Sequence, residues 1–558
     1  MNESLRLPLF FFLLLLFGSF AHGYIDNPDS EVEYQTARSI ARRGGTGLSL
    51  THEDASPAER MICERAFDVM PGRDGKLYSW FGLGHALSIL PFYAAGRGLA
   101  ALFPGFEARI EKSWASAGAP ERRAVGDEFF SRFLVSMHSP LFGALLGVVL
   151  LALLGRLGFG AVPATLAVLL ATLTTQLGPE SRESMGTVQS AFFLLWSLER
   201  SLAYRLSTRD RPGRLLAAGM LGGFAVLSRV THVLPLLALG LYLLHHAVKE
   251  RRFRGLACFA LGGLPFALWL LWFNQARFGT PFETGYSEAL SAGYWNFNFL
   301  IGFGFLALSP GKGAFLFSPL LCLAPVGLAR SKRTRKSENW LLLSFLLAPW
   351  ILNSFTTGWH SSHAWGSRYM TLGTVLLVAL AAAVLLERGG RRMIWALLIL
   401  GGLGLVINLG GWLTPYHGYY DLAFRAIRLR WPEVPRGDLM HYLVAEPRMS
   451  PLLCHWIYAW HSLWGAIGDP AARGPYESLF GVSLHGAAVP AWPEDAAFRH
   501  LRWIGLSAHT KSVVPILHGL PCLGMAAVEG IRLGRRVHGM PAATRRVHPP
   551  TGAAGCRL

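Results

Sequence analysis

The topology of this chain depends on residues 82–103, which read GLGHALSILPFYAAGRGLAALF. The segment is apolar and long enough to cross a bilayer as a helix. Its polar and helix-breaking residues favour instead a broken helix on the outer membrane surface; they are Gly82, Gly84, His85, Pro91 and Gly96. The choice matters because lysine and arginine in short loops set membrane orientation. Counting 82–103 as a crossing would place every basic loop outside.

With 82–103 at the interface, the apolar segments give one consistent map. The chain starts inside and crosses at 6–22, 134–154, 159–177 and 186–204. Two short arms within 215–247 then go out and return, with Arg229 near their tip. The loops that fall inside are all basic, and they are 205–214, 248–254, 330–338 and 387–392. The outer loops carry one Arg each, and they are 178–185, 274–298 and 356–368.

The rest of the chain continues this pattern. Residues 299–308 are expected to form a partial or re-entrant helix, and Ser309–Gly313 interrupts the chain before a crossing at 313–329. Further crossings follow at 340–355, 369–386 and 393–412. The predicted domains are a transmembrane module at 1–412 with its first outer loop at 23–133, a small outer domain at 413–511, and a last crossing with a basic inner tail at 512–558.

Composition indicates the same class of protein. The 558 residues are 52% hydrophobic and 15% charged, with a mean hydropathy of +0.34, which is too apolar for a soluble globule. Helices satisfy their own backbone inside a bilayer, so we expect an all-α polytopic protein with about 11–12 transmembrane helices. The net charge of +18 is explained largely by the short inner loops. No nucleic-acid-binding motif accompanies it, so we expect the lipid bilayer and not nucleic acid as a partner.

An acidic stretch directly after the first crossing is the first candidate for chemistry. Asp26, Asp29, Glu31 and Glu33 lie close together there. Carboxylates at a membrane surface can supply a general base or bind a divalent metal. They also suit the start of a helix, where negative charge stabilises the helix dipole. The sequence leaves these readings open, so it neither requires nor excludes a metal and names no cofactor.

Three cations expected at the outer face are harder to explain by topology. Arg229, Lys312 and Arg368 lie against the positive-inside trend, and charges near membrane depth usually line polar cavities. Each one alone could extend to the outer headgroups. Together they predict a common site for a phosphate, which arginine can bind through two donors. Near Arg368, Trp359 and His360 belong to an aromatic loop that is either an interfacial belt or a platform for a sugar.

Five stretches together resemble the polyprenyl-phosphate-dependent glycosyltransferases of the GT-C superfamily, which include protein O-mannosyltransferases and lipid A aminoarabinose transferases. The stretches are PDSEVEYQTARSI (28–40), YSWFG (78–82), NQARFGTPFETGY (274–286), SPGKG with FSP (309–313 and 317–319) and WGSRY (365–369). Their order and their membrane side agree with that family. So does a long first outer loop with a non-crossing helix, which implies a GT-C-like bundle.

The resemblance implies that a sugar passes from a polyprenyl-phosphate donor to an acceptor at the outer face of the cell's inner (plasma) membrane. By position, the role of base toward the acceptor carries over to Asp29. Glu31 or Asp26 could share that role, because Ser30 stands where the family commonly has a second acid. The departing lipid phosphate would be held by three cations, namely Arg229, Lys312 and Arg368. Attack opposite the phosphate would invert the anomeric centre.

One position departs from the family pattern. Gln189 stands where the family often has an acidic or histidine residue early in the helix after the second outer loop. Glu180 and Glu183 in that loop are the substitutes, and with Trp359 and His360 they are candidates for binding the sugar or acceptor.

Two other functions are compatible with a polytopic membrane protein. A lipid or polysaccharide flippase would place polar residues at mid-depth and often contains a repeated half, whereas the polar residues here gather at the outer ends of the crossings. A non-catalytic membrane scaffold is the second alternative. Neither the sugar nor the acceptor can be read from the sequence, because transfer to a glycan, a lipid or a protein would look alike.

Overall fold

The computed structural model describes residues 3–25, 27–109, 128–207, 211–286, 293–295, 297–414, 416–435, 438–457 and 514–538. Regular structure in these residues is almost entirely helical. The exception is an antiparallel hairpin of two short strands, β1 (Val69–Pro71) and β2 (Leu77–Ser79). The expected all-α polytopic architecture, with a long first outer loop that contains interfacial helices, is confirmed.

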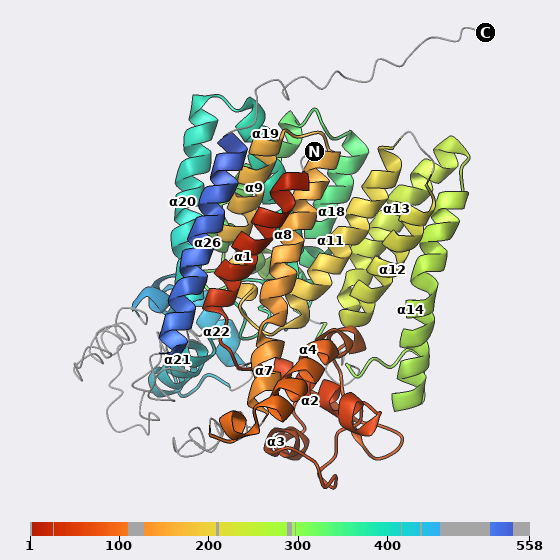
Figure 1. Cartoon of the computed structure of the whole chain (residues 1–558), viewed down its shortest axis with the longest axis vertical. Helices are drawn as coiled ribbons and strands as arrows, with labels where there is room; N and C mark the ends of the chain where they lie inside the picture. The colour runs from red at the N-terminus through yellow and green to blue at the C-terminus, as the bar shows by residue number, and fades with distance from the viewer. Residues whose placement is uncertain are drawn as a thin grey trace.

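Long helices run side by side along the long axis of the molecule (Figure 1). They are α1 (Arg6–Phe20), α8 (His138–Arg156), α9 (Ala161–Leu173), α11 (Gly186–Arg205), α12 (Gly213–Ser228), α13 (Val233–Glu250), α14 (Arg254–Phe278), α18 (Lys336–Ser354), α19 (Thr371–Arg388), α20 (Arg391–Leu413) and α26 (Val514–His538). By length and composition, the described residues include five helices able to cross a membrane, besides several shorter apolar ones.

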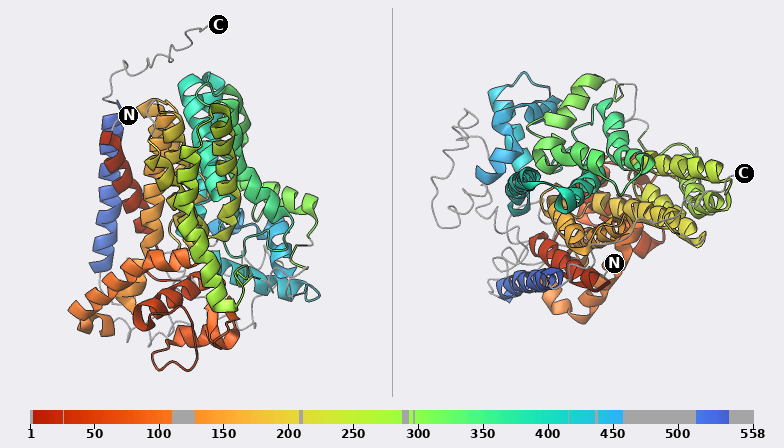
Figure 2. Two further views of the ribbon diagram at one scale, coloured as in Figure 1. Left: turned by 90° about the vertical axis from the view of Figure 1, so that its right-hand side faces the viewer. Right: turned by 90° about the horizontal axis from the view of Figure 1, so that it is seen from above.

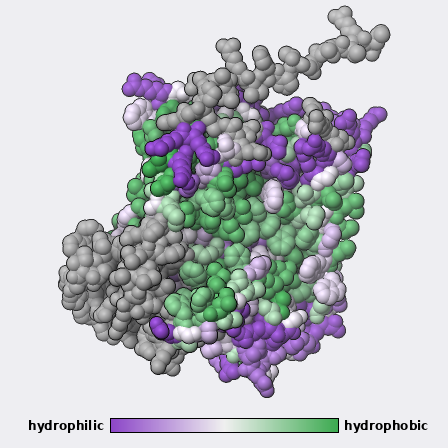
Figure 3. Space-filling view, viewed as in Figure 1, coloured by the Kyte–Doolittle hydropathy of each residue, from purple (hydrophilic) through white to green (hydrophobic). Residues whose placement is uncertain are grey.

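The ends of this bundle differ in the way the loop charges predict. The connections between α11 and α12, α13 and α14, and α19 and α20 lie at the end where α1 begins (Figure 1). A hydrophobic band occupies the middle of the surface, between hydrophilic ends (Figure 3). This distribution fits a bilayer around the middle of the bundle, with the basic loops on the side of the N-terminus.

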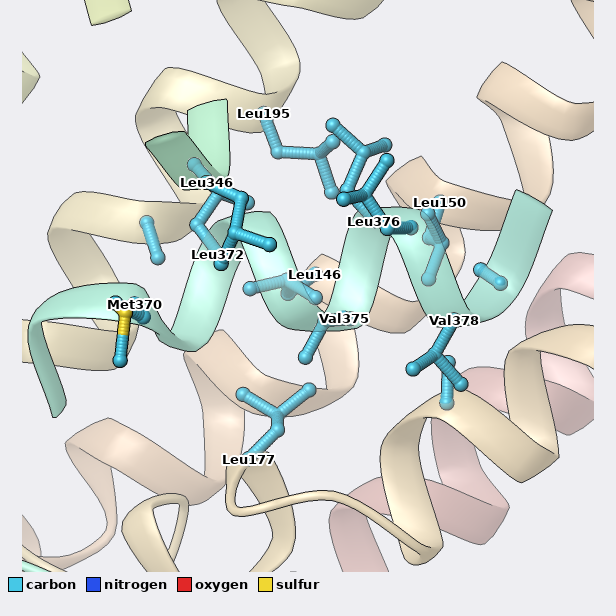
Figure 4. Close-up of a cluster of buried hydrophobic side chains, with 14 of the residues drawn as sticks. Leu146, Leu150, Leu177, Leu195, Leu346, Met370, Leu372, Val375, Leu376 and Val378 are labelled. Carbon is cyan, nitrogen blue, oxygen red and sulfur yellow. The ribbon is translucent and has the colours of Figure 1, made fainter. Parts of the chain in front are cut away.

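Helix α19 is the centre of the bundle. Every residue from Thr371 to Leu385 is buried, and Figure 4 shows Leu372, Val375 and Leu376 amid side chains of α8, α11 and α18. Helix α14 is the opposite case. Only 11% of the residues in its most apolar 18-residue stretch are buried, whereas 89% are buried in the corresponding stretch of the span that contains α19. Apolar side chains left open in this way suit contact with lipid rather than water.

The first outer loop covers one end of the bundle. It contains α2 (Pro28–Arg43), α3 (Pro57–Arg65), the β1–β2 hairpin, α4 (Leu83–Leu102) and α7 (Phe129–Ser136). Helix α4, which holds the deciding segment 82–103, lies with α2 and α7 at that end and does not run along the bundle (Figures 1 and 2). Gly82 and Gly84 allow this docking, because a Cβ at either would lie within 2.6 Å of Leu227 or Ser228 at the end of α12.

Two predicted segments differ in detail from the structure. Helix α15 (Phe299–Leu308) ends at the expected break, but the crossing expected at 313–329 is divided into α16 (Ala314–Phe317), η3 (Pro319–Leu323) and α17 (Ala324–Arg330). Proline explains the division, because Pro319 lacks the N–H that would continue α16 and disfavours a helical conformation at Ser318. Ser318 accordingly has φ −139° and ψ 71°.

The beginning of the predicted outer domain at 413–511 packs against the bundle. Helices α21 (Tyr416–Arg430) and α22 (Leu439–Ala445) contribute Tyr420, Leu443 and other side chains to the main hydrophobic core. Tyr420 donates a hydrogen bond to the carbonyl oxygen of Ala364 at 3.1 Å. Residues 458–511 of that predicted domain lie outside the described residues.

Candidate functional site

Helix α2 presents two acidic faces at the outer end of the bundle. Asn27 caps the helix by accepting a hydrogen bond from the backbone N–H of Asp29 at 2.9 Å, and Pro28 occupies the first turn. Residues four apart lie on one face of a helix, whereas residues two apart do not. Asp29 and Glu33 therefore share one face, and Glu31 points to the other.

Asp29 forms an ion pair with Arg368, which precedes α19. Both terminal nitrogens of Arg368 donate to Oδ2 of Asp29, at 3.1 and 3.2 Å. The pair joins the first outer loop to the loop before α19, so two residues far apart in sequence meet at the outer end. Among the described residues, Nε of Arg368 is buried without a hydrogen-bond partner. Arg368 thus holds the expected base and keeps one donor free for another acceptor.

Arg229, at the tip of the α12–α13 arms, lies on the same side of the bundle as Arg368. One of its terminal nitrogens donates to Oγ1 of Thr187 at 2.9 Å. The guanidinium carbons of Arg229 and Arg368 lie 5.4 and 5.9 Å from the centre of the Tyr369 ring. Because both distances end at the same ring centre, the two guanidinium groups lie close to each other. Both arginines also line one pocket, whose wall continues into the apolar side chains of Leu194, Phe345 and Leu372.

Glu180 is a buried acid at the end of the short helix α10 (Leu177–Glu180), which lies between α9 and α11 in the chain. Thr371 donates to its Oε1 at 2.8 Å, and within the described part of the chain its Oε2 is buried without a hydrogen-bond partner. Burial raises the pKa of Glu180 to about 8, although the Thr371 hydrogen bond and the charges of Arg229, Arg368 and Lys312 act in the opposite sense. Glu180 therefore lies within the field of all three predicted cations.

Two further acids face Asp29: Glu33, which the sequence analysis named only as part of the acidic stretch, and Asp68, which it did not name. The pKa of Glu33 is raised to about 8, by burial first and then by the neighbouring charge of Asp29. Asp68, between α3 and β1, has a pKa raised to about 8 by burial, by the charge of Asp29 and by a hydrogen bond with it. The spacing of four residues from Asp29 could have identified Glu33. No local pattern identifies Asp68, because its place depends on how the hairpin packs.

Lys312 is used differently from the two arginines. Its ammonium group donates to the carbonyl oxygen of Ser362 at 2.8 Å and also to that of Ala364, and it lies 5.0 Å from the centre of the Tyr420 ring. The side chain is fully buried. Lys312 thus secures the loop that leads to Arg368, and it reaches the site through its charge.

Glu31 is held away from Asp29 by a second arginine. Nη1 and Nη2 of Arg132 donate to its two carboxylate oxygens at 2.5 and 2.9 Å, and Gln35 donates to Oε1 at 2.8 Å. A carboxylate bound in this bidentate way is strongly oriented. The expectation that Glu31 shares the role of base is therefore not supported by its position.

Of the remaining predicted residues, Glu183 and Trp359 are buried and His360 is half-buried. Glu183 faces His22 at 3.3 Å and Arg182 at 3.5 Å. Trp359 is 0% exposed and packs on Phe305 with ring centres 5.3 Å apart, so it offers no open face to a sugar ring. Nδ1 of His360 accepts a hydrogen bond from the backbone of Ser362 at 3.0 Å.

The arrangement can bind an anion beside a base. Arg229 and Arg368 supply two fixed positive charges at the pocket, and Asp29 supplies an oriented carboxylate. Within the described residues, no group of three or more His, Cys, Asp or Glu side chains is arranged to hold a metal ion.

Comparisons with known proteins agree with the motifs. Residues 127–272 match the family model of dolichyl-phosphate-mannose-protein mannosyltransferases, which confirms the resemblance to the GT-C superfamily. The crystal structure of ArnT from Cupriavidus metallidurans bound to undecaprenyl phosphate is 13% identical with a TM-score of 0.46, covering 95% of this chain and 77% of that chain. The archaeal oligosaccharyltransferase AglB from Archaeoglobus fulgidus, in complex with an inhibitory peptide and a dolichol-phosphate, is 13% identical with a TM-score of 0.40, covering 80% and 60%. Both structural likenesses are distant. No curated protein matches the sequence.

Proposed function

We propose that this chain is a glycosyltransferase of the cell's inner (plasma) membrane, which transfers a sugar from a polyprenyl-phosphate donor to an acceptor at the outer face. The observation that carries the proposal is the ion pair of Asp29 with Arg368, at a pocket that Arg229 also lines. A base and two phosphate-binding cations are the groups that such a transfer needs, and they come from three separate parts of the chain.

In the proposed reaction, Asp29 accepts the proton of the acceptor hydroxyl as the acceptor oxygen attacks the anomeric carbon. The bond from that carbon to the phosphate oxygen breaks, and its electron pair stays on the phosphate. Arg229 and Arg368 stabilise this developing charge in a site that excludes much of the water. Attack opposite the leaving phosphate inverts the anomeric configuration. The acceptor can be a glycan, a lipid or a protein.

Lys312 and Glu180 support the site in this proposal. Lys312 fixes the loop before Arg368 through two carbonyl oxygens and adds positive charge nearby. Glu180 is neutral near pH 7, since its pKa is raised to about 8, and it therefore does not cancel the positive charge of the arginines. Glu183, Trp359 and His360 then act on the site only through the loops that they hold.

The test uses purified protein in lipid nanodiscs with a labelled sugar on a short polyprenyl phosphate. We expect release of polyprenyl phosphate by the wild type and loss of that release in Asp29→Asn. Asp74→Asn is the matched control, because Asp74 is an acid of the same outer loop that pairs with Lys76 and Tyr78 in the hairpin turn. Movement of the intact lipid between leaflets without release would instead identify a flippase, and inertness in both assays would favour a scaffold.

A further inference from the structure

Arg277, at the outer end of α14, is a buried cation whose hydrogen-bond partners, within the described residues, carry no charge. Nη1 donates to the carbonyl oxygen of Ser79 at 2.7 Å, and Nη2 donates to Oδ1 of Asn274 at 2.9 Å. Glu283, the next acid along the chain, instead accepts a hydrogen bond from the backbone of Gly285 at 2.7 Å. Arg277 is only 5% exposed, so its side chain is enclosed by protein and does not extend to the lipid headgroups.

Two aromatic rings hold the guanidinium group of Arg277. Its central carbon lies 3.9 Å from the centre of the Phe273 ring and 4.5 Å from the centre of the Phe278 ring. Rings against the face of a guanidinium group leave its edge donors, which are the donors that bind carboxylate or phosphate. One of them, Nε, is buried without a hydrogen-bond partner in the described part of the chain. A buried charge of this kind is costly, and an anionic ligand would compensate it.

Arg277 lines a pocket between the first outer loop and the end of α14, which reaches the level of that loop (Figure 1). Apolar side chains form part of the wall, among them Phe81, Leu83 and Phe273. Glu33 of α2 also lines the pocket. The pKa of Glu33 is raised to about 8, by burial first, so Glu33 is neutral near pH 7 and leaves the charge of Arg277 uncancelled.

This pocket adjoins the proposed donor site but is separate from it. Glu33 lies one helical turn after Asp29, on the same face of α2. Gly82, another lining residue, packs on the end of α12 directly before Arg229, because a Cβ at Gly82 would lie 2.4 Å from the carbonyl oxygen of Leu227. The pocket that Arg229 lines shares none of these lining residues. A molecule bound at Arg277 therefore lies beside the base without occupying the place of the donor phosphate.

The neighbouring surface of α14 indicates where such a molecule comes from. Trp269 and Trp272, within one turn of Phe273, are 41% and 65% exposed on a helix that faces lipid. Tryptophan is typical of the boundary between the hydrocarbon core and the headgroups. The pocket thus has a cation at the level of the outer headgroups and an apolar wall beside the lipid chains.

We infer that the pocket at Arg277 binds the phosphate head of an anionic lipid from the outer leaflet, and that this lipid is the sugar acceptor. The first part stands on the pocket alone, whereas the role of acceptor rests on the proposed function. The free Nε–H of Arg277 donates to a phosphate oxygen, and the lipid chains lie beside α4 and α14. A hydroxyl of the lipid head gives its proton to Asp29 as its oxygen forms the bond to the anomeric carbon.

The experiment measures binding of dihexanoyl phosphatidylglycerol to the full-length protein in an uncharged detergent. Arg277→Gln should raise the Kd on the order of tenfold to a hundredfold, because it removes a charge-assisted contact. Arg73→Gln is the matched control, since Arg73 is exposed beside Gly279 and is not among the residues that line the pocket. Its Kd should stay within about twofold of the wild type, as for other exposed charges. An unchanged Kd in Arg277→Gln, or equal losses in the two variants, overturns the inference.

Two further probes separate the phosphate head from the chains. Dihexanoyl phosphatidylcholine has the same chains without net charge and should bind the wild type more weakly. Equal binding of the two lipids would overturn the anion site. Glycerol 3-phosphate has the anion without chains and should also bind more weakly. If it binds as tightly as phosphatidylglycerol and with the same dependence on Arg277, the ligand is a soluble phosphate and the lipid source is wrong.

A readout on the wild type does not depend on the folding of a variant. Phosphatidylglycerol with a photoreactive group in one chain should label α4 and the outer half of α14, and an excess of the unreactive lipid should prevent this labelling. Labelling confined to other helices overturns the inference.

Binding of a short-chain polyprenyl phosphate separates this inference from the proposed function. Arg277→Gln should bind it as the wild type does, because Arg229 and Arg368 remain. A comparable loss would place Arg277 in the donor site and overturn the separate pocket. If the wild type itself binds no polyprenyl phosphate, the proposed function fails, and the phosphatidylglycerol measurements still decide whether Arg277 holds an anionic lipid.

Discussion

The two faces of α2 show how the same residue types serve different purposes. On one face, Glu31 is bound by both terminal nitrogens of Arg132, whose side chain is 1% exposed. Farther along the helix, Arg42 and Tyr34 bind Glu128. On the other face, Asp29 is bound by Arg368, which keeps a free Nε–H among the described residues. On the first face, Glu31 and Glu128 are both paired with arginines. On the second face, Arg368 still has a donor with which it can bind a ligand.

The difference follows from what each face packs against. The Glu31 face meets α7, which supplies Arg132, and the resulting pairs bind the outer loop together. The Asp29 face meets the tips of the bundle, where Arg229 and Arg368 line one pocket. Buried ion pairs are weak sources of net stability but costly to break. The fully paired acids on the Glu31 face therefore indicate a structural role. The additional arginine donors beside the pocket on the Asp29 face indicate a ligand-binding site.

The largest expected effect comes from the face of α2 that carries Asp29. Asp29→Asn should lower sugar transfer roughly 10²–10⁴-fold, because general bases typically contribute that much. Binding of polyprenyl phosphate should persist, since both arginines remain. Single-turnover assays on nanodisc samples measure this. Glu31→Gln is the matched variant on the other face, and its transfer per folded molecule should stay within a few-fold of the wild type. Equal losses in the two variants would remove the distinction between the faces.

Substitutions on the face of α2 that carries Glu31 should lower the stability of the protein. Glu31→Gln leaves the buried Arg132 without its carboxylate, and breaking such a pair costs about 3–5 kcal/mol. Thermal unfolding of the purified protein should therefore begin at a lower temperature in Glu31→Gln than in Asp29→Asn. The reverse order would show that the Asp29 pair, and not the Glu31 pair, holds the outer loop.

The cations should divide into two kinds. Arg229→Gln and Arg368→Gln should each weaken donor use on the order of tenfold to a hundredfold, because each removes a charge-assisted contact worth roughly 1.5–3 kcal/mol. Lys312→Gln should act mainly on the loop that it anchors, lowering the unfolding temperature with a smaller change in donor KM. Michaelis kinetics together with unfolding curves separate these outcomes. A donor KM change in Lys312→Gln as large as in Arg229→Gln would make Lys312 a direct phosphate ligand.

The smallest expected effect is a pH dependence of the donor KM, which arises from two acids near the arginines of the site. Glu33 and Glu180 have pKa values raised to about 8, so both are neutral near pH 7 and ionise as pH rises through that value. Each then adds negative charge beside the arginines, and donor KM should rise several-fold over about two pH units. Glu180→Gln should reduce this rise in donor KM. Glu128→Gln should leave the rise unchanged, because Glu128 pairs with Arg42 on the Glu31 face of α2. An unchanged rise in Glu180→Gln would contradict the assignment.

Periodic and charged features made much of the fold predictable. Apolar length located the crossings, and loop charge placed 82–103 at the interface. The break at Ser309–Gly313 also follows from local chemistry. The division of 313–329 depends on Pro319, whose effect an apolar count does not register.

The site was predictable only in part. Asp29 and the cations could be chosen because charge at the outer face is unusual, and structure brings Asp29, Arg229 and Arg368 to one place. The sequence could not show that Lys312 is bound by carbonyl oxygens or that Trp359 is enclosed by aromatic rings, since both depend on tertiary packing. Asp68 has no signal of its own in the sequence, because its place depends on how the turn before β1 packs.

A map of the full-length protein with bound polyprenyl phosphate tests the central claim most directly. We predict that the phosphate lies at the pocket between Arg229 and Arg368, with at least one nitrogen of each within about 3 Å of a phosphate oxygen. Asp29 should remain beside Arg368, facing the anomeric position. A phosphate bound elsewhere, for example against the basic loops at the opposite end of the bundle, would contradict the account.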